Sequence, residues 1–399
     1  MSTIKVNKIE NTATANGGVA IDVDGHVTID GQNFPTTGPL SNRNMIINGA
    51  MQVAQRSTSS TLSGINSVDR WYGIFSQGAV TQSQEAIDLA DQPFTEDGLR
   101  NYFRLTNDTA STAAAAFRGF TQIIEAQNAA TSGWNYTSSS SFITLSFWVR
   151  ASVSQKFYGQ LLTMDGTVQN YVFSFTPAAN TWTKVVKTIP GNSNSQINLD
   201  NGEGIRVRIM PYWGTNFTDS GVAEDTWFAW TTGTRVPDMT TTWTNTAGAT
   251  FDLTGVQLEV GSKSTPFEHR SYGDELQRCM RYFQIIDGTT AGGALTFGNG
   301  CTRAANNTHI QIPLGIALRD KPALSVTNTI RMTFAGSIVT SSADSPTLGG
   351  IAPSVHTDGT NFNVTLNYNG DVGYTTTANT GGIVLMLNTP GTVRLDSEL

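Results

Sequence analysis

The sequence predicts an all-β protein built around a β-sandwich, and three observations carry this prediction. Only 14% of the 399 residues are charged and 38% are hydrophobic, while Gly, Thr, Ser and Asn fill most of the difference. This composition is typical of a β protein with many turns. Short segments of alternating polarity recur along the chain, with turn residues between them. The long helical periods of an alternating β–α protein do not occur.

The first predicted element is a β-hairpin. Residues 17–23 and 26–30 alternate in polarity, and Asp24-Gly25 between them is a strong signal for a two-residue turn. A hairpin alone is only marginally stable in water. Its apolar side chains need a partner surface, and we expect other copies of the chain to supply it; the alternative is that the hairpin folds back onto the main body. The apolar side chains are Val19, Ile21, Val23, Val27 and Ile29.

The sandwich itself is predicted for residues 43–270. In the clearest strand, residues 141–150, one face carries only aliphatic and aromatic side chains. In the strand at 205–209, Arg206 and Arg208 face away from the aliphatic residues. The alternation recurs at residues 171–175, 182–189 and 253–258. Many short strands of period two, joined by turns, favour two packed antiparallel sheets.

One helix and a second β-rich region complete the prediction. Residues 274–283 place apolar side chains at helical spacing, and Asp274 is a suitable N-cap. This helix lies in a linking segment, residues 271–286. Residues 287–399 are again rich in Gly, Thr and Asn, which predicts a small β-sandwich. Its candidate strands are residues 309–313, 323–328, 332–338, 361–368 and 382–387.

Charge and composition also exclude several classes of partner. The net charge is −7 and the sequence has no run of Lys and Arg, which argues against a nucleic-acid partner. No apolar run approaches the ~20 residues of a membrane helix, so we expect no membrane insertion. The N-terminus lacks the apolar core of a signal peptide, which predicts synthesis in a cytoplasm. Cys279 and Cys301 are therefore expected to be reduced.

Four spaced motifs resemble a known family. They are NMIINGAMQVAQR at 44–56, VDRW at 68–71, LTGVQLEVG at 253–261 running on to TPFEHRSY at 265–272, and ELQRCMRYF at 275–283. In this order they resemble bacteriophage tail fibre and related virion proteins that carry a jelly-roll module similar to carbohydrate-binding modules. Residues 145–152 resemble the central strand of that module. Shorter stretches at 4–9, 313–324 and 395–399 resemble the ends of such fibres.

The resemblance implies a structural protein of the virion tail that is not an enzyme. Residues 1–42 would be a virion-attachment stalk bound to a phage tail or baseplate protein, residues 43–270 the jelly roll, and residues 287–399 the tip. The ligand would be a host cell-surface polysaccharide or lipopolysaccharide. Two alternatives remain open. One is a head fibre or capsid decoration protein, and the other is a polysaccharide-degrading or free carbohydrate-binding protein.

A homotrimer is expected from the hairpin, the helix and the resemblance together. Three hairpins could bury their apolar side chains against each other, and three helices could meet on one axis. The predicted trimer contacts are Val19, Ile21, Val27, Ile29, Leu276, Met280 and Phe283.

Aromatic residues in turn-rich sequence are the candidates for glycan contact. A sugar ring has an apolar face that stacks on an indole or phenol ring, while neighbouring polar groups bind the hydroxyls. Packing in a core or between subunits is the alternative explanation. The candidates are Trp134, Tyr136, Tyr212, Trp213 and Trp243.

Catalytic and metal chemistry is weakly represented. Glycoside hydrolysis needs two facing carboxylates, and Glu203, Glu224 and Asp225 are the nearest candidates, although solvated loop acids explain them better. The turns at 22–25 and 200–203 offer oxygen ligands for a structural Ca²⁺, but ordinary turn chemistry explains them equally. We therefore expect no catalytic residue and no bound cofactor. The Asp69-Arg70-Trp71 and Glu268-His269-Arg270 groups are expected to be ion pairs and caps that close the sandwich.

Overall fold

The structure is a computed structural model that describes part of the 399-residue chain. The described residues are 8–10, 18–22, 25–29, 32–34, 41–287, 295–304, 307–320, 322–327, 330–334, 337–340, 363–369, 383–387 and 392–399. The chain divides into two compact units, Met1–Glu275 and Leu276–Leu399. The described residues form mostly antiparallel strands, with three short helices, so the predicted all-β class is confirmed.

The N-terminal strands form a larger sheet than the predicted hairpin. The sheet has four antiparallel strands in chain order, so the two predicted strands have neighbours on both sides. The strands are β1 (Lys8–Glu10), β2 (Gly18–Ile21), β3 (Val27–Ile29) and β4 (Gln32–Phe34). The prediction of an isolated two-stranded hairpin is therefore wrong, because it treated the flanking segments as irregular.

The turn between β2 and β3 also differs from the predicted two-residue turn. The last paired residues are Ile21 and Val27, and the Asp22 N–H donates to the His26 carbonyl at 3.0 Å. The turn therefore extends from Asp22 to His26. Gly25 has a φ of 86°, the left-handed conformation that glycine adopts without strain. Val23 and Asp24 lie outside the described residues.

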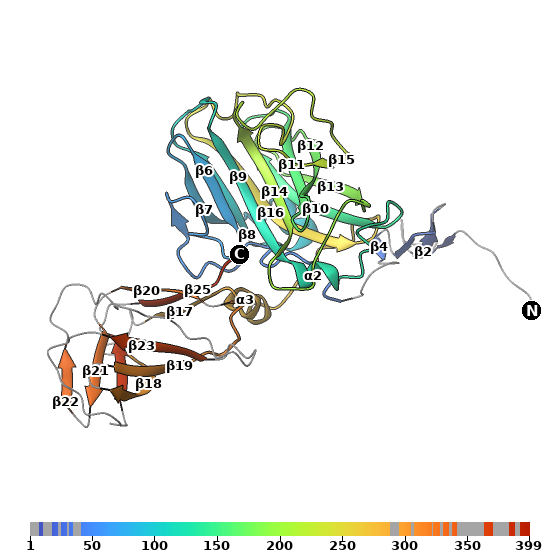
Figure 1. Ribbon diagram of the computed structural model, residues 1–399. Coiled ribbons are helices and arrows are strands. Elements are labelled where there is room, and N and C mark those ends of the chain that lie inside the picture. The colour runs from blue at the N-terminus through green and yellow to red at the C-terminus, as the bar shows by residue number, and fades with distance from the viewer. Residues whose placement is uncertain are drawn as a thin grey trace, which may run out of the picture. The chain divides into compact units, whose positions relative to one another are not determined.

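Two six-stranded antiparallel sheets form the central sandwich (Figure 1). The β10 sheet has the order β13 (Thr183–Pro190), β10 (Phe142–Ala151), β16 (Ala249–Val260), β8 (Asn101–Asn107), β7 (Thr81–Ala86) and β5 (Ser59–Ser60). The β14 sheet has the order β15 (Trp227–Ala229), β12 (Gln169–Phe175), β11 (Phe157–Thr163), β14 (Glu203–Trp213), β9 (Phe117–Glu125) and β6 (Tyr72–Ser76). The predicted β-sandwich is confirmed.

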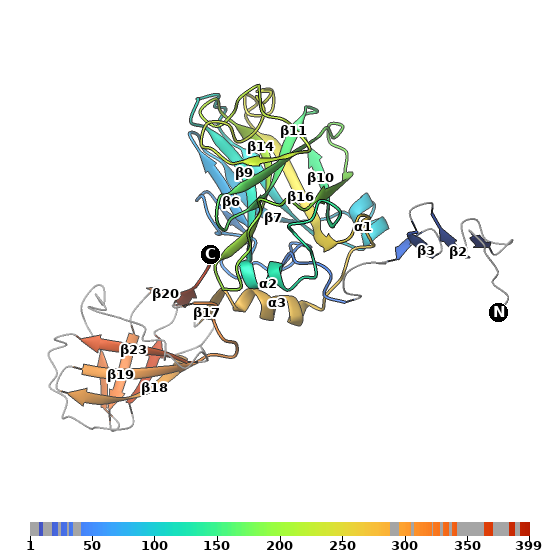
Figure 2. The same cartoon turned by 45° about the vertical axis from the view of Figure 1, so that its right-hand side comes forward.

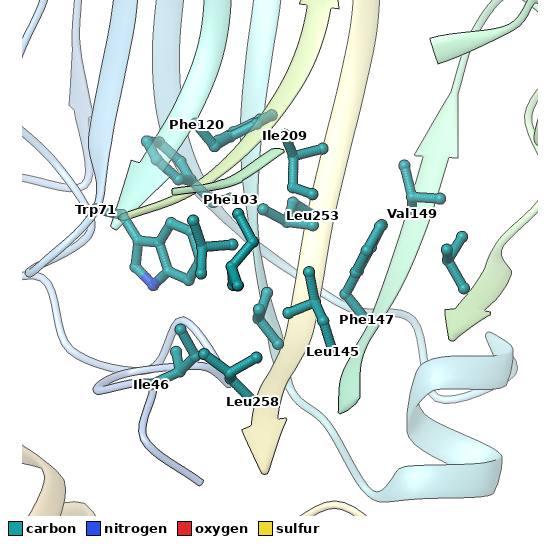
Figure 3. Close-up of a cluster of buried hydrophobic side chains, with 14 of the residues drawn as sticks. Ile46, Trp71, Phe103, Phe120, Leu145, Phe147, Val149, Ile209, Leu253 and Leu258 are labelled. Atoms are coloured by element: carbon teal, nitrogen blue, oxygen red, sulfur yellow. The ribbon is translucent and has the colours of Figure 1, made fainter. Parts of the chain in front are cut away.

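The core lies between the inner faces of these sheets, at the alternate positions that the sequence predicts. The inward residues of β10, from Ile143 to Val149, and those of β14, from Ile205 to Ile209, belong to one buried cluster (Figure 3). Trp71 closes one end of it, fully buried, and its indole N–H donates to the Asn48 carbonyl at 3.1 Å. The inward members of β10 are Ile143, Leu145, Phe147 and Val149.

Two short helices lie within this unit. Helix α1 (Gln92–Asp97) packs against β16 and ends at Gly98, whose φ of 64° is the left-handed cap that glycine provides (Figure 2). Helix α2 (Ala126–Ala130) follows β9 directly and buries Ala126 and Ala129 in the main core.

The third helix is shorter than predicted. Helix α3 (Tyr272–Met280) ends before Phe283, which instead begins a strand and is buried. Residues 283–286, predicted to belong to the linking segment, therefore pair within the C-terminal unit. Phe283 cannot share a helical face with Leu276 and Met280, which corrects its predicted place in a three-helix contact.

The C-terminal unit contains two antiparallel sheets in its described residues. The first has the order β17 (Phe283–Asp287), β25 (Thr392–Asp396) and β20 (Ala323–Thr327). The second has the order β22 (Ser337–Thr340), β21 (Ile330–Phe334), β24 (Ile383–Leu387), β18 (Leu295–Ala304), β19 (Asn307–Pro313) and β23 (Asn363–Asn369). The strand predicted at 332–338 corresponds to two paired strands, β21 and β22.

None of the helices in the described part of the chain has the length and apolar character required to cross a membrane.

Candidate binding surface

The aromatic residues predicted to form an exposed glycan platform lie inside the protein. Trp134, Tyr212, Trp213 and Trp243 are at most 3% exposed, and Tyr136 is half-buried against the main core. Their expected exposure is therefore wrong. An indole or phenol ring buried this far has no free face on which a sugar ring could stack.

Trp243 shows the physical reason for this correction. Its indole N–H donates to the Thr250 carbonyl at 2.9 Å, and its backbone N–H donates to the Gln155 side chain at 2.8 Å. Its ring meets Phe251 edge-on, with centroids 6.4 Å apart. The polar, turn-rich sequence around Trp243 packs down onto the sandwich, so its aromatic residue becomes part of the core.

The outer face of the β10 sheet is closed by a satisfied polar and aromatic network. Asp252, fully buried, accepts hydrogen bonds from Arg104 at 2.7 Å and from Arg150 at 2.9 Å. The Arg150 guanidinium also stacks 4.6 Å from the Trp182 ring. The indole N–H of Trp148 donates to Asp97 at 2.6 Å, which fastens the α1 segment over this face. This arrangement is structural.

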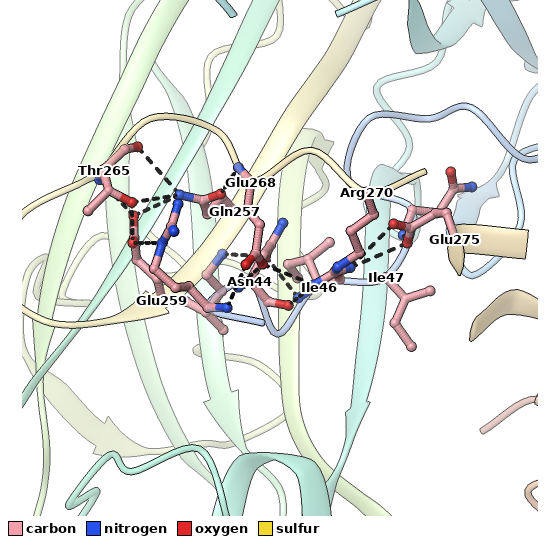
Figure 4. Close-up of polar contacts among 12 residues, drawn as sticks. Asn44, Ile46, Ile47, Gln257, Glu259, Thr265, Glu268, Arg270 and Glu275 are labelled. Carbon is pink, nitrogen blue, oxygen red and sulfur yellow. Dashed lines mark hydrogen bonds and ion pairs between the residues drawn. The ribbon is translucent and has the colours of Figure 1, made fainter. Parts of the chain in front are cut away.

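The Glu268-His269-Arg270 group closes the sandwich as the sequence predicts. Glu268 accepts the backbone N–H of Asn44 at 2.9 Å, and Arg270 donates to the Asn44 and Ile46 carbonyls (Figure 4). Arg270 also pairs with Glu275 at 3.3 Å. Burial raises the pKa of Glu268, but the backbone N–H donors and neighbouring arginines outweigh it and hold the pKa below the usual range.

The Asp69-Arg70-Trp71 group, which belongs to another of the four motifs, also closes the sandwich. Asp69 accepts the Gln55 backbone N–H at 3.0 Å and lies 3.6 Å from Arg56. Burial raises the pKa of Asp69 despite these partners. Arg70, with a φ of 70°, donates to the Ile123 carbonyl at 2.7 Å. Both groups are therefore ion pairs and caps, as predicted.

A small cleft lies beside the Arg270 network, with a volume of about 460 Å³ that includes space open to solvent. Its lining includes Asn44, Arg100, His269 and Glu275. The His269 imidazole donates to the Asp97 carbonyl at 2.7 Å, and Glu275 is paired with Arg270. His269, Arg270 and Glu275 are held in these contacts, so we assign them to the closure of the sandwich.

The outer face of the β14 sheet carries a different kind of cluster, which we call the arginine–aromatic cluster. Its members are Arg206, Arg208, Trp213, Trp230 and Arg235. The Arg235 guanidinium lies 5.1 Å from the Trp213 ring and 4.9 Å from the Trp230 ring, and that of Arg208 lies 5.4 Å from Trp213. Trp213 is buried, whereas the other four members are half-buried. The cluster can therefore be reached from solvent.

Backbone register explains why these residues meet. Arg206 and Arg208 are two residues apart in β14, on the face opposite the core. Arg235 comes from the segment that crosses this face, where its carbonyl accepts hydrogen bonds from Gln160 at 2.7 Å and Asn170 at 2.8 Å. Arg235 is distant from Arg206 and Arg208 in sequence and joins them only in the fold.

Several polar atoms of this face are buried without a hydrogen-bond partner. They include the Nε of Arg208 and the indole nitrogens of Trp213 and Trp230. Gln160 Oε1 and Thr121 Oγ1 are also buried without a hydrogen-bond partner. Both residues lie opposite Arg208 in the neighbouring strands. Buried polar atoms are usually paired, and each unpaired one costs free energy. These atoms are themselves buried, so they mark imperfect polar packing beneath the cluster rather than groups that face solvent.

The charge at this cluster is also unbalanced. Arg206 is paired with Glu203, but Arg208 and Arg235 have no ion-pair partner among the described residues. Loss of hydration, together with the neighbouring Arg206 and Arg235 charges, lowers the pKa of Arg208 to about 9. An anion placed here would relieve the repulsion among the guanidinium groups.

Two of the acids considered for catalysis, Glu203 and Glu224, are held in other contacts, whereas Asp225 is exposed. Glu203 pairs with Arg206, and Glu224 pairs with Lys156 and accepts a hydrogen bond from Ser174. Burial raises the pKa of Glu224, but these bonds outweigh it and leave the pKa lowered. In the turn at 200–203, Asp200 accepts the Gly202 N–H at 2.9 Å. Within the described ranges, no group of three His, Cys, Asp or Glu residues is placed to hold a metal ion.

Comparisons with known proteins gave solved structures with sandwich-like parts, several of them carbohydrate-binding modules. A family 11 module from Clostridium thermocellum covers 52% of this chain and 96% of its own, with 13% identity and a TM-score of 0.26. A family 61 module in complex with β-1,4-galactotriose covers 56% of this chain and 100% of its own, with 10% identity and a TM-score of 0.28. An arabinose-bound α-L-arabinofuranosidase covers 55% of this chain but only 26% of its own, with 15% identity and a TM-score of 0.29.

TM-scores this low establish neither a shared fold nor a shared function. No family model matches the chain, and no curated protein matches it.

Proposed function

We propose that this chain is a non-catalytic glycan-binding protein of a bacteriophage virion, and that it is a homotrimeric tail fibre. The observation that carries glycan binding is the arginine–aromatic cluster on the outer face of the β14 sheet. It combines the half-buried Trp230 ring with the half-buried guanidinium groups of Arg206, Arg208 and Arg235 at one place that solvent reaches. Glycan sites use the same combination of apolar ring contact and a few fixed polar groups.

The virion part of the proposal is supported by the four spaced motifs and by the N-terminal sheet. Ile9, Val19 and Ile29 form one row across β1, β2 and β3, and each is 37–64% exposed. Among the described residues, His26 Nε2 lies 2.7 Å from Ser262 Oγ and Asp22 pairs with Lys263 at 3.7 Å, and neither contact involves this row. We propose that this face contacts other copies of the chain, and that residues 1–42 attach to a tail or baseplate protein.

Two rival functions keep parts of this architecture. A head fibre or capsid decoration protein would have the same sandwich at another place on the particle. A free carbohydrate-binding or polysaccharide-degrading protein would not be part of a particle. Immunogold labelling of intact particles with an antibody to the C-terminal unit separates these cases. Label at the tail tip supports the proposal, label on the head favours the first rival, and unlabelled particles contradict a virion role.

Binding and catalysis are tested together with polysaccharide and lipopolysaccharide purified from the host. The full-length chain is expected to bind one of them saturably in calorimetry and to release no reducing sugar during prolonged incubation. Neutralising Glu203, Glu224 and Asp225 together is expected to leave this binding intact. Release of reducing sugar that disappears in the triple variant would contradict the non-catalytic proposal. Absence of binding to every host glycan would contradict glycan recognition itself.

A further inference from the structure

We infer that the arginine–aromatic cluster binds the carboxylate of an acidic sugar, so that the ligand is an acidic polysaccharide. This inference rests on the proposed glycan binding and names the class of its ligand. Three features of the cluster lead to it, namely its charge, its guanidinium donors and its half-buried ring, together with the charge of the rest of the chain.

The charge is concentrated and only partly neutralised. Arg206 and Arg235 lie close enough to Arg208 to disfavour its charged form. Glu203 is the acid whose charge opposes this effect on Arg208. On the outer face of the other sheet, Arg104 and Arg150 both pair with Asp252. On the β14 sheet, the ion pairs of Arg208 and Arg235 are completed by an anion that is not part of this chain.

The donors suit a planar anion. A guanidinium presents parallel N–H groups that match the two oxygens of a carboxylate. Arg208 and Arg235 are half-buried, and no acid pairs with either of them among the described residues. Arg235 is held rigidly, because its ring contacts and its Nε hydrogen bond to the Thr232 carbonyl, at 3.0 Å, fix its plane. Little side-chain entropy would be lost on binding.

The aromatic part of the cluster distinguishes a sugar from a simple inorganic anion. An inorganic anion such as sulfate has no apolar face, whereas a sugar ring has one that can stack on an indole. The half-buried Trp230 ring adds an apolar surface beside the Arg235 guanidinium.

The rest of the chain makes non-specific attraction of polyanions unfavourable. The net charge is −7, so the average field of the protein repels an acidic polymer. An acidic polysaccharide that binds this chain must therefore bind at a local concentration of positive charge. The cluster supplies that concentration, and single substitutions within it can test it.

The test compares two polymers with the same sugar backbone, polygalacturonate and its methyl ester, in affinity electrophoresis of the full-length chain. The wild-type chain is expected to be retarded by polygalacturonate and not by the ester. Arg208→Gln is expected to weaken binding roughly tenfold or more, equivalent to about 1.4 kcal/mol. Arg208→Lys keeps a positive charge without the planar fork. Its affinity for polygalacturonate is expected to lie between those of the wild-type chain and Arg208→Gln. Equal retardation by both polymers, or by neither, overturns the inference.

Arg104→Gln is the matched control, because Arg104 lies on the outer face of the other sheet and has its acid partner. It is expected to retain binding but to unfold at a lower temperature. Arg208→Gln is expected to weaken binding without lowering the unfolding temperature, because it removes an unpaired charge from a partly dehydrated place. If Arg208→Gln lowers the unfolding temperature or changes the mass of the assembly, Arg208 is structural or lies at a subunit contact, and the inference fails.

The outcomes also separate this inference from the proposed function. A chain that binds purified host glycan but ignores the carboxylate of polygalacturonate keeps the proposed function and loses the ligand class. A chain that binds no host glycan loses the proposed function, whatever its behaviour toward polygalacturonate.

Discussion

At the scale of single residues, Arg270 joins three separate parts of the sandwich. It donates to the carbonyls of Asn44 and Ile46, and it pairs with Glu268 and Glu275. Its side chain is only 8% exposed, so removing it leaves two carboxylates without their cation in a dehydrated place.

Replacing Arg270 with Ala is expected to lower the free energy of unfolding by about 3–5 kcal/mol, because a buried ion pair is broken from one side. Urea denaturation followed by circular dichroism measures this. Arg270→Lys keeps the charge and is expected to lose less. A change within about 0.5 kcal/mol for Arg270→Ala, the range of ordinary surface substitutions, would contradict the role given to this residue.

The pKa of Glu268 predicts how stability depends on pH. Because the folded state holds this pKa below its ordinary value of 4.5, the carboxylate contributes its full stabilisation above that value. The contribution is lost as pH falls through the lowered folded-state pKa. We expect the free energy of unfolding to decline below about pH 4.5 and Glu268→Gln to flatten that decline. Identical profiles for the two proteins would show that Glu268 is not part of the acid response.

The sequence predicted these ion pairs but not the arginine–aromatic cluster. Arg270, for example, lies close in sequence to its partners Glu268 and Glu275. Arg206 and Arg208 gave a signal, because they alternate on the outward face of their strand. Arg235 gave none, because its place depends on how a long segment crosses the sheet.

At the scale of elements, strand alternation predicted the core well and loop packing poorly. The inward positions of β10 are those expected from period two. Trp134 and Trp243 were misplaced because turn-rich sequence was taken to be exposed. Whether a turn packs inward depends on contacts with residues distant in sequence, such as the hydrogen bond between Trp243 and Gln155, which local sequence does not reveal.

Replacing Trp243 with Ala is therefore expected to destabilise the sandwich by about 3–5 kcal/mol, the usual cost of removing a core Trp. Thermal unfolding and urea denaturation measure the change. Trp230→Ala is the matched control, because its ring is half-buried and its removal opens a smaller cavity. If Trp243→Ala unfolds like the wild-type chain and instead loses glycan binding, the burial assigned to Trp243 is wrong.

At the scale of the whole molecule, the N-terminal sheet predicts the oligomeric state. Ile9, Val19 and Ile29 are adjacent exposed apolar side chains, which a contact with other copies of the chain would bury. We expect light scattering to give three times the 42.8 kDa mass of one chain.

Replacing both Val19 and Ile29 with Asp is expected to reduce the assembly to single chains, because charge would have to be buried at the contact. Leu199→Asp is the control, since Leu199 is 75% exposed and lies outside the N-terminal sheet. A wild-type chain that remains a monomer at every concentration would contradict the homotrimer.

The central claim is that glycan binds the outer face of the β14 sheet, and hydrogen exchange of the full-length chain with and without host polysaccharide tests it most directly. Binding slows exchange where a ligand covers or stabilises the backbone. The claim predicts protection in β14 (Glu203–Trp213) and in residues 230–235, with little change on the outer face of the β10 sheet. Protection confined to residues 287–399, with β14 unchanged, would contradict it and assign glycan recognition to the C-terminal unit.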